Sequence, residues 1–278
     1  MQSSQRTVYG AYLQTVQLLG LPVVIKDNST LNEKFSIHNN EVLGLNDVPT
    51  VKYIGIGNGG HRMVVGADNI SRPEPVLHTP ENAALYNQLP FVLRLPTNDL
   101  TAAERLNYRL RRVETYNGTT YVAYYLKVLD LTTTAPQLEL RTLDAGVVTS
   151  SEYVPTVSDL NPTPPAVSPG NTLTTTGDYI AATAKLPFTM TPDDITEFLE
   201  VCNIIYGDPN YAMISEIALC SGFDKGLPGD FNGSTVNYTD AISVQVTNFI
   251  TAFFSASFSN NGIGVTFDIG SAEPLLVV

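Results

Sequence analysis

The stretch LNYRLRRVETYNGTTYVAYYLKVLDL, residues 106–131, decides the expected fold. At its centre, Asn117-Gly118 is a residue pair preferred in two-residue type I′ turns, which need a positive φ at both positions. Tyr116 then faces Thr119 across the turn. We therefore expect an antiparallel β-hairpin with Asn117 and Gly118 at its tip.

The second strand of this hairpin is apolar on both faces. Successive side chains of a strand point to opposite sides. One face carries Tyr121, Ala123 and Tyr125, and the other carries Val122, Tyr124, Leu126 and Val128. Such a strand lies in the middle of a sheet or is covered by another subunit.

Five of the fifteen cationic residues fall within nineteen positions around the first strand: Arg94, Arg105, Arg109, Arg111 and Arg112. Arginine makes planar, two-pronged contacts with carboxylates and phosphates. Three uses stay open: pairing with acids of the same chain, a subunit interface, or nucleic acid. Tyr and Arg are enriched at interface cores. The candidate interface consists of Arg105, Arg109, Arg111, Arg112, Tyr121, Tyr124 and Tyr125.

Further elements are expected on both sides of this hairpin. Apolar spacing and capping residues predict helices over residues 6–19, 80–88 and 192–206. Runs of β-branched and apolar residues predict strands at 21–25, 51–57, 212–220, 241–247, 249–258 and 263–269. A turn at 259–262 would make the last two strands a terminal hairpin. The expected class is α+β and strand-rich, with antiparallel sheets, β-sandwich-like elements and a few helices.

A break in composition divides the chain. Residues 149–178 carry five prolines among Ser, Thr, Asn and Gly, a composition that favours neither helix nor central strand. Residues 1–142 hold 13 Lys+Arg and 12 Asp+Glu, whereas residues 143–278 hold 2 and 15. We therefore expect an N-terminal α+β domain at 1–148, a linker or extended excursion at 149–178, and an acidic C-terminal α+β domain at 179–278.

The composition excludes several classes of protein. The charged fraction is 15%, below the ~25% of an average globular chain, and there are 14 Tyr and 11 Phe. Few charges and many aromatic residues argue against disorder. No apolar run reaches the ~18 residues that span a membrane, and we see no signal peptide. The net charge of −12 disfavours nucleic acid as a partner.

The motifs that often carry chemistry are incomplete. GIGNGG at residues 55–60 matches a dinucleotide-binding pattern, but no good helix follows it, which leaves a loop or a close backbone approach. His38, His61 and His78 lack metal-binding spacing. Cys202 and Cys220 fit structural burial. We expect no catalytic, cofactor-binding or metal site.

Five phrases together carry a resemblance: YIGIGNGGHRM (53–63), RPEPVLHTPENAALYNQLPFVLR (72–94), the hairpin at 107–131, MISEIALCSG (213–222) and the apolar C-terminal stretch 249–269. In organisation they resemble virion structural proteins of tailed bacteriophages, and are most similar to contractile-tail baseplate wedge proteins. The resemblance implies a non-enzymatic subunit present in several copies.

The expected function is therefore that of a structural subunit of a phage tail or baseplate. Its partners would be other tail and baseplate subunits and copies of itself, with no membrane and no small-molecule substrate. Its location would be the virion, after synthesis in the host cytoplasm. Two alternatives stay open: a neck, head–tail connector or capsid decoration protein, and a carbohydrate-binding or carbohydrate-active tail protein.

Overall fold

The computed structural model describes residues 3–164, 174–231, 233–258 and 262–277. Strands dominate, the sheets are antiparallel, and helices are few, which confirms the expected α+β, strand-rich class. The chain divides into two compact units. Unit 1 contains residues 1–129 and 189–263, and unit 2 contains residues 130–188 and 264–278.

Unit 1 contains most of the regular structure. Its strands are β1 (Ser3–Arg6), β2 (Thr50–Gly57), β3 (His61–Val65), β4 (Ser71–Pro75), β5 (Gln88–Leu89), β6 (Val92–Arg94), β7 (Tyr108–Tyr116), β8 (Thr119–Val128), β12 (Met213–Phe231) and β13 (Ser234–Ser255). Its helices are α1 (Val8–Leu19), α2 (Leu31–Phe35), α3 (Ala102–Arg105) and α5 (Pro192–Tyr206), with short 3₁₀ turns at Pro96–Asn98, Pro209–Tyr211 and Ala256–Phe258.

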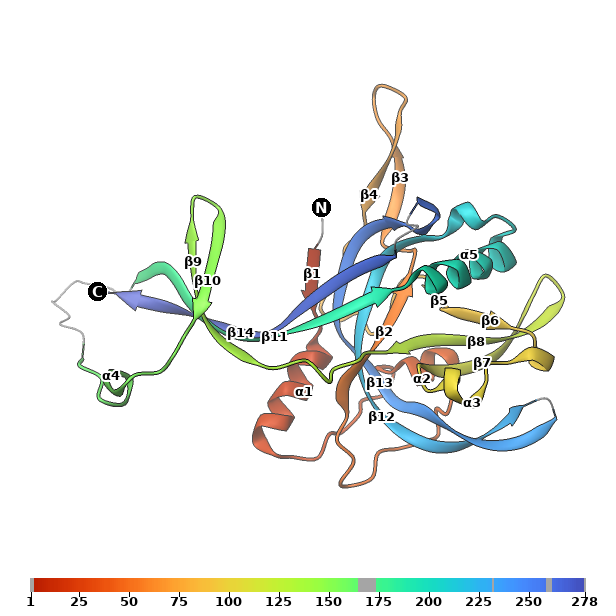
Figure 1. The fold of residues 1–278 in the computed structure, drawn as a ribbon, viewed down its shortest axis with the longest axis horizontal. Helices are drawn as coiled ribbons and strands as arrows, with labels where there is room; N and C mark the ends of the chain where they lie inside the picture. Colours follow the sequence, from red (N-terminus) through yellow and green to blue (C-terminus); the bar gives the residue numbers. More distant parts are fainter. Residues whose placement is uncertain (1–2, 165–173, 232, 259–261, 278) are drawn as a thin grey trace. The chain divides into compact units, whose positions relative to one another are not determined.

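An eight-stranded antiparallel sheet forms the core of unit 1. Its main path runs β1-β13-β12-β2-β8-β6, with β7 paired to β8 and β5 paired to β2 (Figure 1). β12 and β13 form a long hairpin, and β12 also pairs with β2. β13 is a single strand where the sequence predicted two, at 241–247 and 249–258. Irregularities in its pairing with β12 bend the ladder without ending it.

The expected hairpin is confirmed as β7 and β8. Tyr116 pairs with Thr119, and Asn117 and Gly118 have φ of 49° and 80°. β8 is flanked by β7 on one edge and by β2 and β6 on the other. Residues 122–126 are buried, so the strand that is apolar on both faces lies inside the sheet.

The two long helices begin and end where their capping residues stand. The Thr7 hydroxyl accepts a hydrogen bond from Gly10 N at the start of α1, and Gly20 ends that helix in the left-handed region. Thr191 and Asp194 form a reciprocal capping box at the start of α5. Gly207 ends α5 at φ 76°, so both predicted helices are confirmed.

Two of the smaller sequence-based predictions are wrong. Residues 21–25 form no strand: they follow the αL cap at Gly20 as an irregular segment and belong to none of the described sheets. Residues 80–88 form no helix. There the backbone N–H groups of Tyr86 and Asn87 donate instead to the buried carboxylate of Glu216, which fixes a non-helical path.

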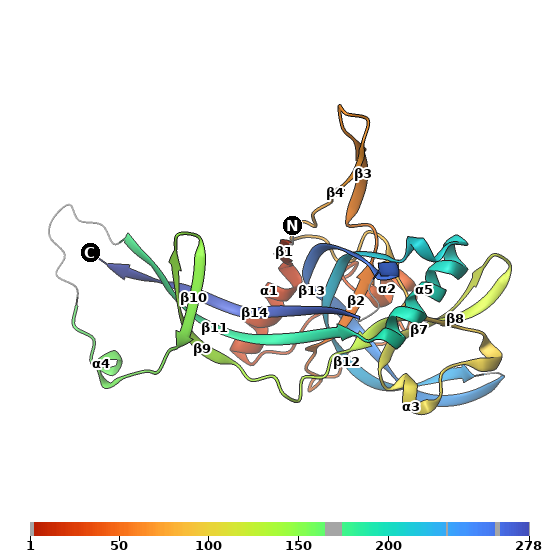
Figure 2. The ribbon, with the colours of Figure 1, turned by 45° about the horizontal axis from the view of Figure 1, so that its top comes forward.

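Unit 2 is a four-stranded antiparallel sheet in the order β10-β9-β11-β14 (Figure 2). Its elements are β9 (Gln137–Asp144), β10 (Val147–Glu152), α4 (Val157–Leu160), β11 (Thr174–Met190) and β14 (Ile263–Val277). The buried apolar side chains of this unit among the described residues are few: Ala181, Leu186, Phe188, Val265 and Phe267.

The boundaries of the units differ from the predicted ones. Residues 149–152 belong to β10 and residues 174–178 to β11, so both sides of the Pro-rich segment lie in the same sheet. Its central residues, 165–173, lie outside the described residues. The predicted terminal hairpin is also wrong, because β14 joins the sheet of unit 2 while β13 pairs with β12 and β1. Strand pairing between distant segments, which local composition does not report, sets these boundaries.

The charge imbalance between the two halves of the sequence disappears in the fold. Unit 1 carries 13 Lys+Arg and 19 Asp+Glu, and unit 2 carries 2 and 8, so each unit has a net charge of −6. Cations of the first half of the chain pair with acids of the second half within unit 1. These pairs are Lys52–Asp224, Arg94–Glu197, Arg109–Asp224 and Lys127–Asp194.

Candidate functional site

The arginine cluster meets Asp224 on β12. Arg109 donates from Nε to Asp224 Oδ1 at 2.6 Å and from Nη2 to Oδ2 at 3.2 Å. Lys52 Nζ and the Tyr53 hydroxyl donate to the same carboxylate at 3.0 and 2.7 Å. Burial alone would raise the pKa of Asp224, but the hydrogen bonds from Arg109, Tyr53 and Lys52 outweigh it and lower the pKa. This carboxylate is held ionised as an internal anchor between β2, β7 and β12.

A second internal anchor forms around Asp99, in the loop before α3. Arg111 donates to Asp99 Oδ2 from Nε at 3.1 Å and from Nη2 at 2.9 Å. The Tyr124 hydroxyl donates to Asp99 Oδ1 at 2.8 Å. The Arg111 and Asp99 side chains are each only 8% exposed. Burial, followed by the hydrogen bond to Asp99, raises the pKa of Tyr124, so the hydroxyl stays protonated as a donor.

Arg112, the third arginine of β7, lies in a more open environment. Its Nη1 lies 3.0 Å from Glu114 Oε1, and its side chain is 41% exposed. The Tyr125 hydroxyl donates to the same Glu114 carboxylate at 2.8 Å. Tyr121 is partly exposed, and its ring lies 6.4 Å from that of Tyr116.

The structure thus separates the seven candidate interface residues into two groups. Arg109, Arg111, Tyr124 and Tyr125 are buried or nearly so within the chain, so a partner could not reach them without opening the sheet. Arg105, Arg112 and Tyr121 are partly accessible. For Arg94, Arg109, Arg111 and Arg112, pairing inside the chain is the use that the structure shows.

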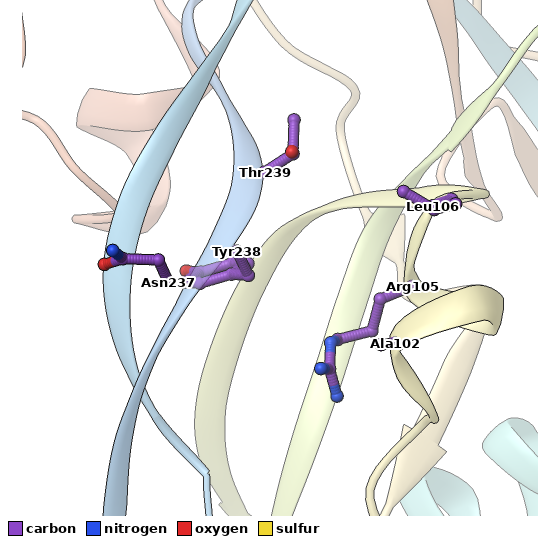
Figure 3. Close-up of a pocket in the computed structure, with 6 residues that line it drawn as sticks. All are labelled: Ala102, Arg105, Leu106, Asn237, Tyr238 and Thr239. Atoms are coloured by element: carbon purple, nitrogen blue, oxygen red, sulfur yellow. The ribbon is translucent and has the colours of Figure 1, made fainter.

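A small pocket lies beside Arg105, between α3 and the tip-side half of β13. Its volume is about 190 Å³. Figure 3 shows the six side chains that line it: Ala102, Arg105 and Leu106 from the α3 side, and Asn237, Tyr238 and Thr239 from β13. The Arg105 guanidinium carbon lies 4.1 Å from the centre of the Phe231 ring. The pocket therefore combines one cation, an aromatic support and neutral polar groups.

The whole chain, residues 1–278, matches a family of unknown function, DUF7208. The chain belongs to this family. No curated protein and no solved structure matches it. The functional assignment of this DUF7208 chain therefore depends on its own geometry.

Sequence reasoning missed a fully buried polar centre of this DUF7208 chain. Glu216 on β12 has a fully buried side chain, and so does His78. Glu216 Oε2 accepts from His78 Nε2 at 2.8 Å and from Tyr86 N at 2.9 Å. Its Oε1 accepts from Asn87 N at 2.8 Å and from Gly59 N at 2.9 Å. The signal that was available is a lone acid inside the apolar run MISEIALC, because a buried charge needs partners.

The environment of Glu216 also explains the GIGNGG motif. A Cβ placed on Gly57 or Gly59 would lie 2.6 or 2.9 Å from Glu216 Oε1, and one on Gly60 would lie 2.3 Å from Ser215 O. The glycines therefore serve a close backbone approach, and β3, a strand, follows where a dinucleotide site needs a helix. Burial alone would raise the pKa of Glu216, but His78 and the three backbone donors outweigh it and lower the pKa.

A second feature that sequence reasoning missed is the hairpin of β3 and β4. It forms a two-stranded sheet of its own and projects from the large sheet of unit 1 (Figure 1). In its register, Met63 pairs with Pro73 and Val65 with Ser71, which puts these side chains on one face. Met63 and Val65 are 57% and 64% exposed. The opposite face carries the ion pair of Arg62 with Glu74.

The remaining reactive groups are enclosed. Cys202 and Cys220 are buried and unpaired, and burial raises the pKa of the Cys202 thiol to about 12. Within the described residues, no group of three or more His, Cys, Asp or Glu side chains could hold a metal ion. In the same part of the chain, no helix has the length and apolar character needed to cross a membrane.

Proposed function

We propose that this chain is a non-enzymatic structural subunit of a bacteriophage tail, built into the baseplate through contacts with neighbouring subunits. The observation that carries this proposal is the exposed apolar face of the β3–β4 hairpin. The resemblance to baseplate wedge proteins supports the baseplate as the assembly. The exposed face of the hairpin supports, on physical grounds, a role in contacts between subunits.

An isolated two-stranded hairpin is marginally stable in water. The two faces of the β3–β4 hairpin nevertheless differ in polarity, and a hairpin surrounded only by water would not need such a difference. One face carries ion-paired side chains, and the other presents Met63 and Val65 to solvent, with Ile70 in the connecting loop 55% exposed. Contiguous exposed apolar side chains with a charged opposite face are typical of a protein–protein contact.

Unit 2 offers independent support. Every residue of its edge strand β10 is exposed, and Val147 and Val148 are 62% and 52% exposed. An exposed edge strand has unpaired N–H and C=O groups that a neighbouring chain can pair with. Contact surfaces on both units favour a subunit that has more than one neighbour, as in a multi-chain assembly.

The test is the position of the chain in purified phage particles. Antibodies raised against the recombinant full chain would be bound to purified phage particles and located by immunogold electron microscopy. Labelling at the distal end of the tail supports the baseplate role. Labelling at the neck or capsid would favour the connector or decoration alternative. If the chain is found only in the fractions without particles after sedimentation, every structural role in the virion is contradicted.

A further inference from the structure

Arg105 differs from the arginines around it in lacking an acidic partner. Its neighbours each contact a carboxylate of the chain: Arg94, Arg109, Arg111 and Arg112. In the part of the chain that the structure describes, no carboxylate lies within ion-pair distance of Arg105. Its Nη1 instead donates to the carbonyl oxygen of Leu100 at 2.5 Å. Arg105 is therefore a positioned, partly accessible cation of unit 1 whose charge is not neutralised by contact with a carboxylate of the described residues.

The guanidinium of Arg105 is held in place by stacking. Phe231 lies 4.1 Å from the guanidinium carbons of both Arg105 and Arg111. Arg111 is already paired with Asp99, so its charge is compensated. A guanidinium that is stacked on a ring keeps its N–H groups in its own plane, where they can donate to a planar acceptor. Because the side chain is already ordered, binding costs little further conformational entropy.

Asp240, the acid that the pocket residue Tyr238 contacts, already has its hydrogen-bonding capacity in use. Asp240 accepts from Leu110 N at 2.6 Å, from Ala241 N at 2.8 Å and from the Tyr238 hydroxyl at 3.2 Å. His38 also lies 3.4 Å from this carboxylate. Since no carboxylate of the described residues pairs with Arg105, we look for its matching acceptor outside the chain.

The pocket beside Arg105 has the size and lining for such an acceptor. Its volume of 190 Å³ corresponds to about six water molecules at the ~30 Å³ each occupies in the liquid. Asn237, Tyr238 and Thr239 line it from β13, and Ala102 and Leu106 supply apolar wall. We propose that this pocket binds a carboxylate group, with Arg105 as its charged partner.

Two sources could supply the carboxylate: an acidic side chain of a partner protein, or a small acid such as a uronic acid. The pocket accommodates either, because each presents the same planar group on a short carbon chain. The proposal does not depend on the virion role, since a carboxylate site on unit 1 would exist in any context.

The test uses the ¹⁵N-labelled full chain in heteronuclear NMR titrations at constant ionic strength. The probes are sodium glucuronate and the tripeptide Glu-Glu-Glu, with glucose as the uncharged control. We expect saturable shifts of the backbone amides of Leu106, Tyr238 and Thr239 with at least one acidic probe and none with glucose. Arg105→Gln should weaken this binding at least tenfold. Arg112→Gln, a surface arginine outside the pocket, should leave it unchanged.

The outcomes separate cleanly. Binding of the tripeptide alone identifies a partner protein as the source, and binding of glucuronate alone identifies a small acid; both support the site. Arg105→Lys keeps the charge but loses the planar fork, so it should bind more weakly than the native chain, and it replaces Arg105→Gln if that variant does not fold. The absence of saturable shifts with both acidic probes would overturn the proposal. Shifts that persist unchanged in both Arg105 variants would overturn it as well.

Discussion

Replacing Glu216 with Gln tests whether the buried centre of unit 1 organises the fold. The change keeps the shape of the side chain and removes its charge. In the native chain, the two carboxylate oxygens accept four hydrogen bonds, from His78 Nε2 and from the backbone of Gly59, Tyr86 and Asn87. An amide supplies one acceptor oxygen and one NH₂ group, so it cannot accept from all four donors.

The cost can be worked out bond by bond. If the amide oxygen takes the position of Oε1, Gly59 N and Asn87 N keep their bonds but lose the charge assistance, about 1 kcal/mol each. His78 can change tautomer and accept from the NH₂ group. Tyr86 N is then a buried donor without an acceptor, which costs about 1–3 kcal/mol. The total is about 3–5 kcal/mol, in the range measured when one partner of a buried ion pair is removed.

The assay is urea denaturation of the full chain at pH 7, followed by circular dichroism, together with calorimetric melting. A loss of about 3–5 kcal/mol should lower the melting temperature by roughly 6–20 °C in a protein of this size. Glu200→Gln is the matched control, because Glu200 lies exposed on α5 and the same charge is removed. Its effect should stay within about 0.5 kcal/mol. A change below about 1 kcal/mol for Glu216→Gln would refute the reasoning.

The pH dependence gives the same centre a second readout. Because the pKa of Glu216 is lowered in the fold, its contribution to stability is present above the unfolded carboxylate pKa of about 4.3. That contribution is lost as the pH falls through the lower folded pKa, since the unfolded chain then binds the proton more tightly. The stability difference between the native chain and Glu216→Gln should therefore narrow as the pH is lowered below about 4. A difference that stays constant from pH 7 to pH 3 would contradict this account.

Three further predictions concern the surface and the hairpins. Gly118→Val should destabilise the chain by about 1–3 kcal/mol in urea denaturation, because φ is 80° at this position and a β-branched residue is strained there; an unchanged midpoint would speak against the turn. Arg111→Gln should cost about 3–5 kcal/mol, because it leaves Asp99 buried without its partner. Arg112→Gln should cost less than about 1 kcal/mol, since the Arg112 side chain is 41% exposed, and equal losses for the two would disprove the difference in burial. Met63→Ser combined with Val65→Ser should leave the melting temperature nearly unchanged but reduce recovery of the chain in purified particles. The control, Arg62→Ser combined with Glu74→Ser on the opposite face, should not reduce this recovery. Normal incorporation of the Met63→Ser/Val65→Ser chain would contradict a subunit contact through the β3–β4 hairpin.

The sequence predicted best those elements whose ends are marked by local chemistry. The tip at Asn117-Gly118 and the caps at Thr191 and Gly207 each depend on a few neighbouring residues, and each was placed correctly. The assignment of 80–88 as a helix failed because Glu216, far away in sequence, takes the backbone donors of that segment. Local signals also could not show that β14 pairs away from β13.

The candidate site was predictable to a similar degree. Arginine clustering predicted a concentration of ionic contacts, and pairing with acids of the same chain was one of the three uses that the sequence left open; the structure shows it for Arg94 and Arg109. Which arginines are buried depends on the register of β7 beside β8 and on the positions of Asp99 and Asp224. The special status of Arg105 follows from the lack of such a partner, and spacing along one strand does not reveal it.

The position of β12 between β2 and β13 has a consequence for synthesis of the chain on the ribosome. β2 ends at residue 57, and the strand that covers its other edge begins at residue 213, more than 150 residues later. At about 5–20 residues per second, the nascent chain waits roughly 10–30 s with this edge and its apolar side chains uncovered. The core of unit 1 therefore closes only near the end of translation. During that interval the growing chain is a substrate for chaperones, and slower elongation would lengthen its exposure to aggregation.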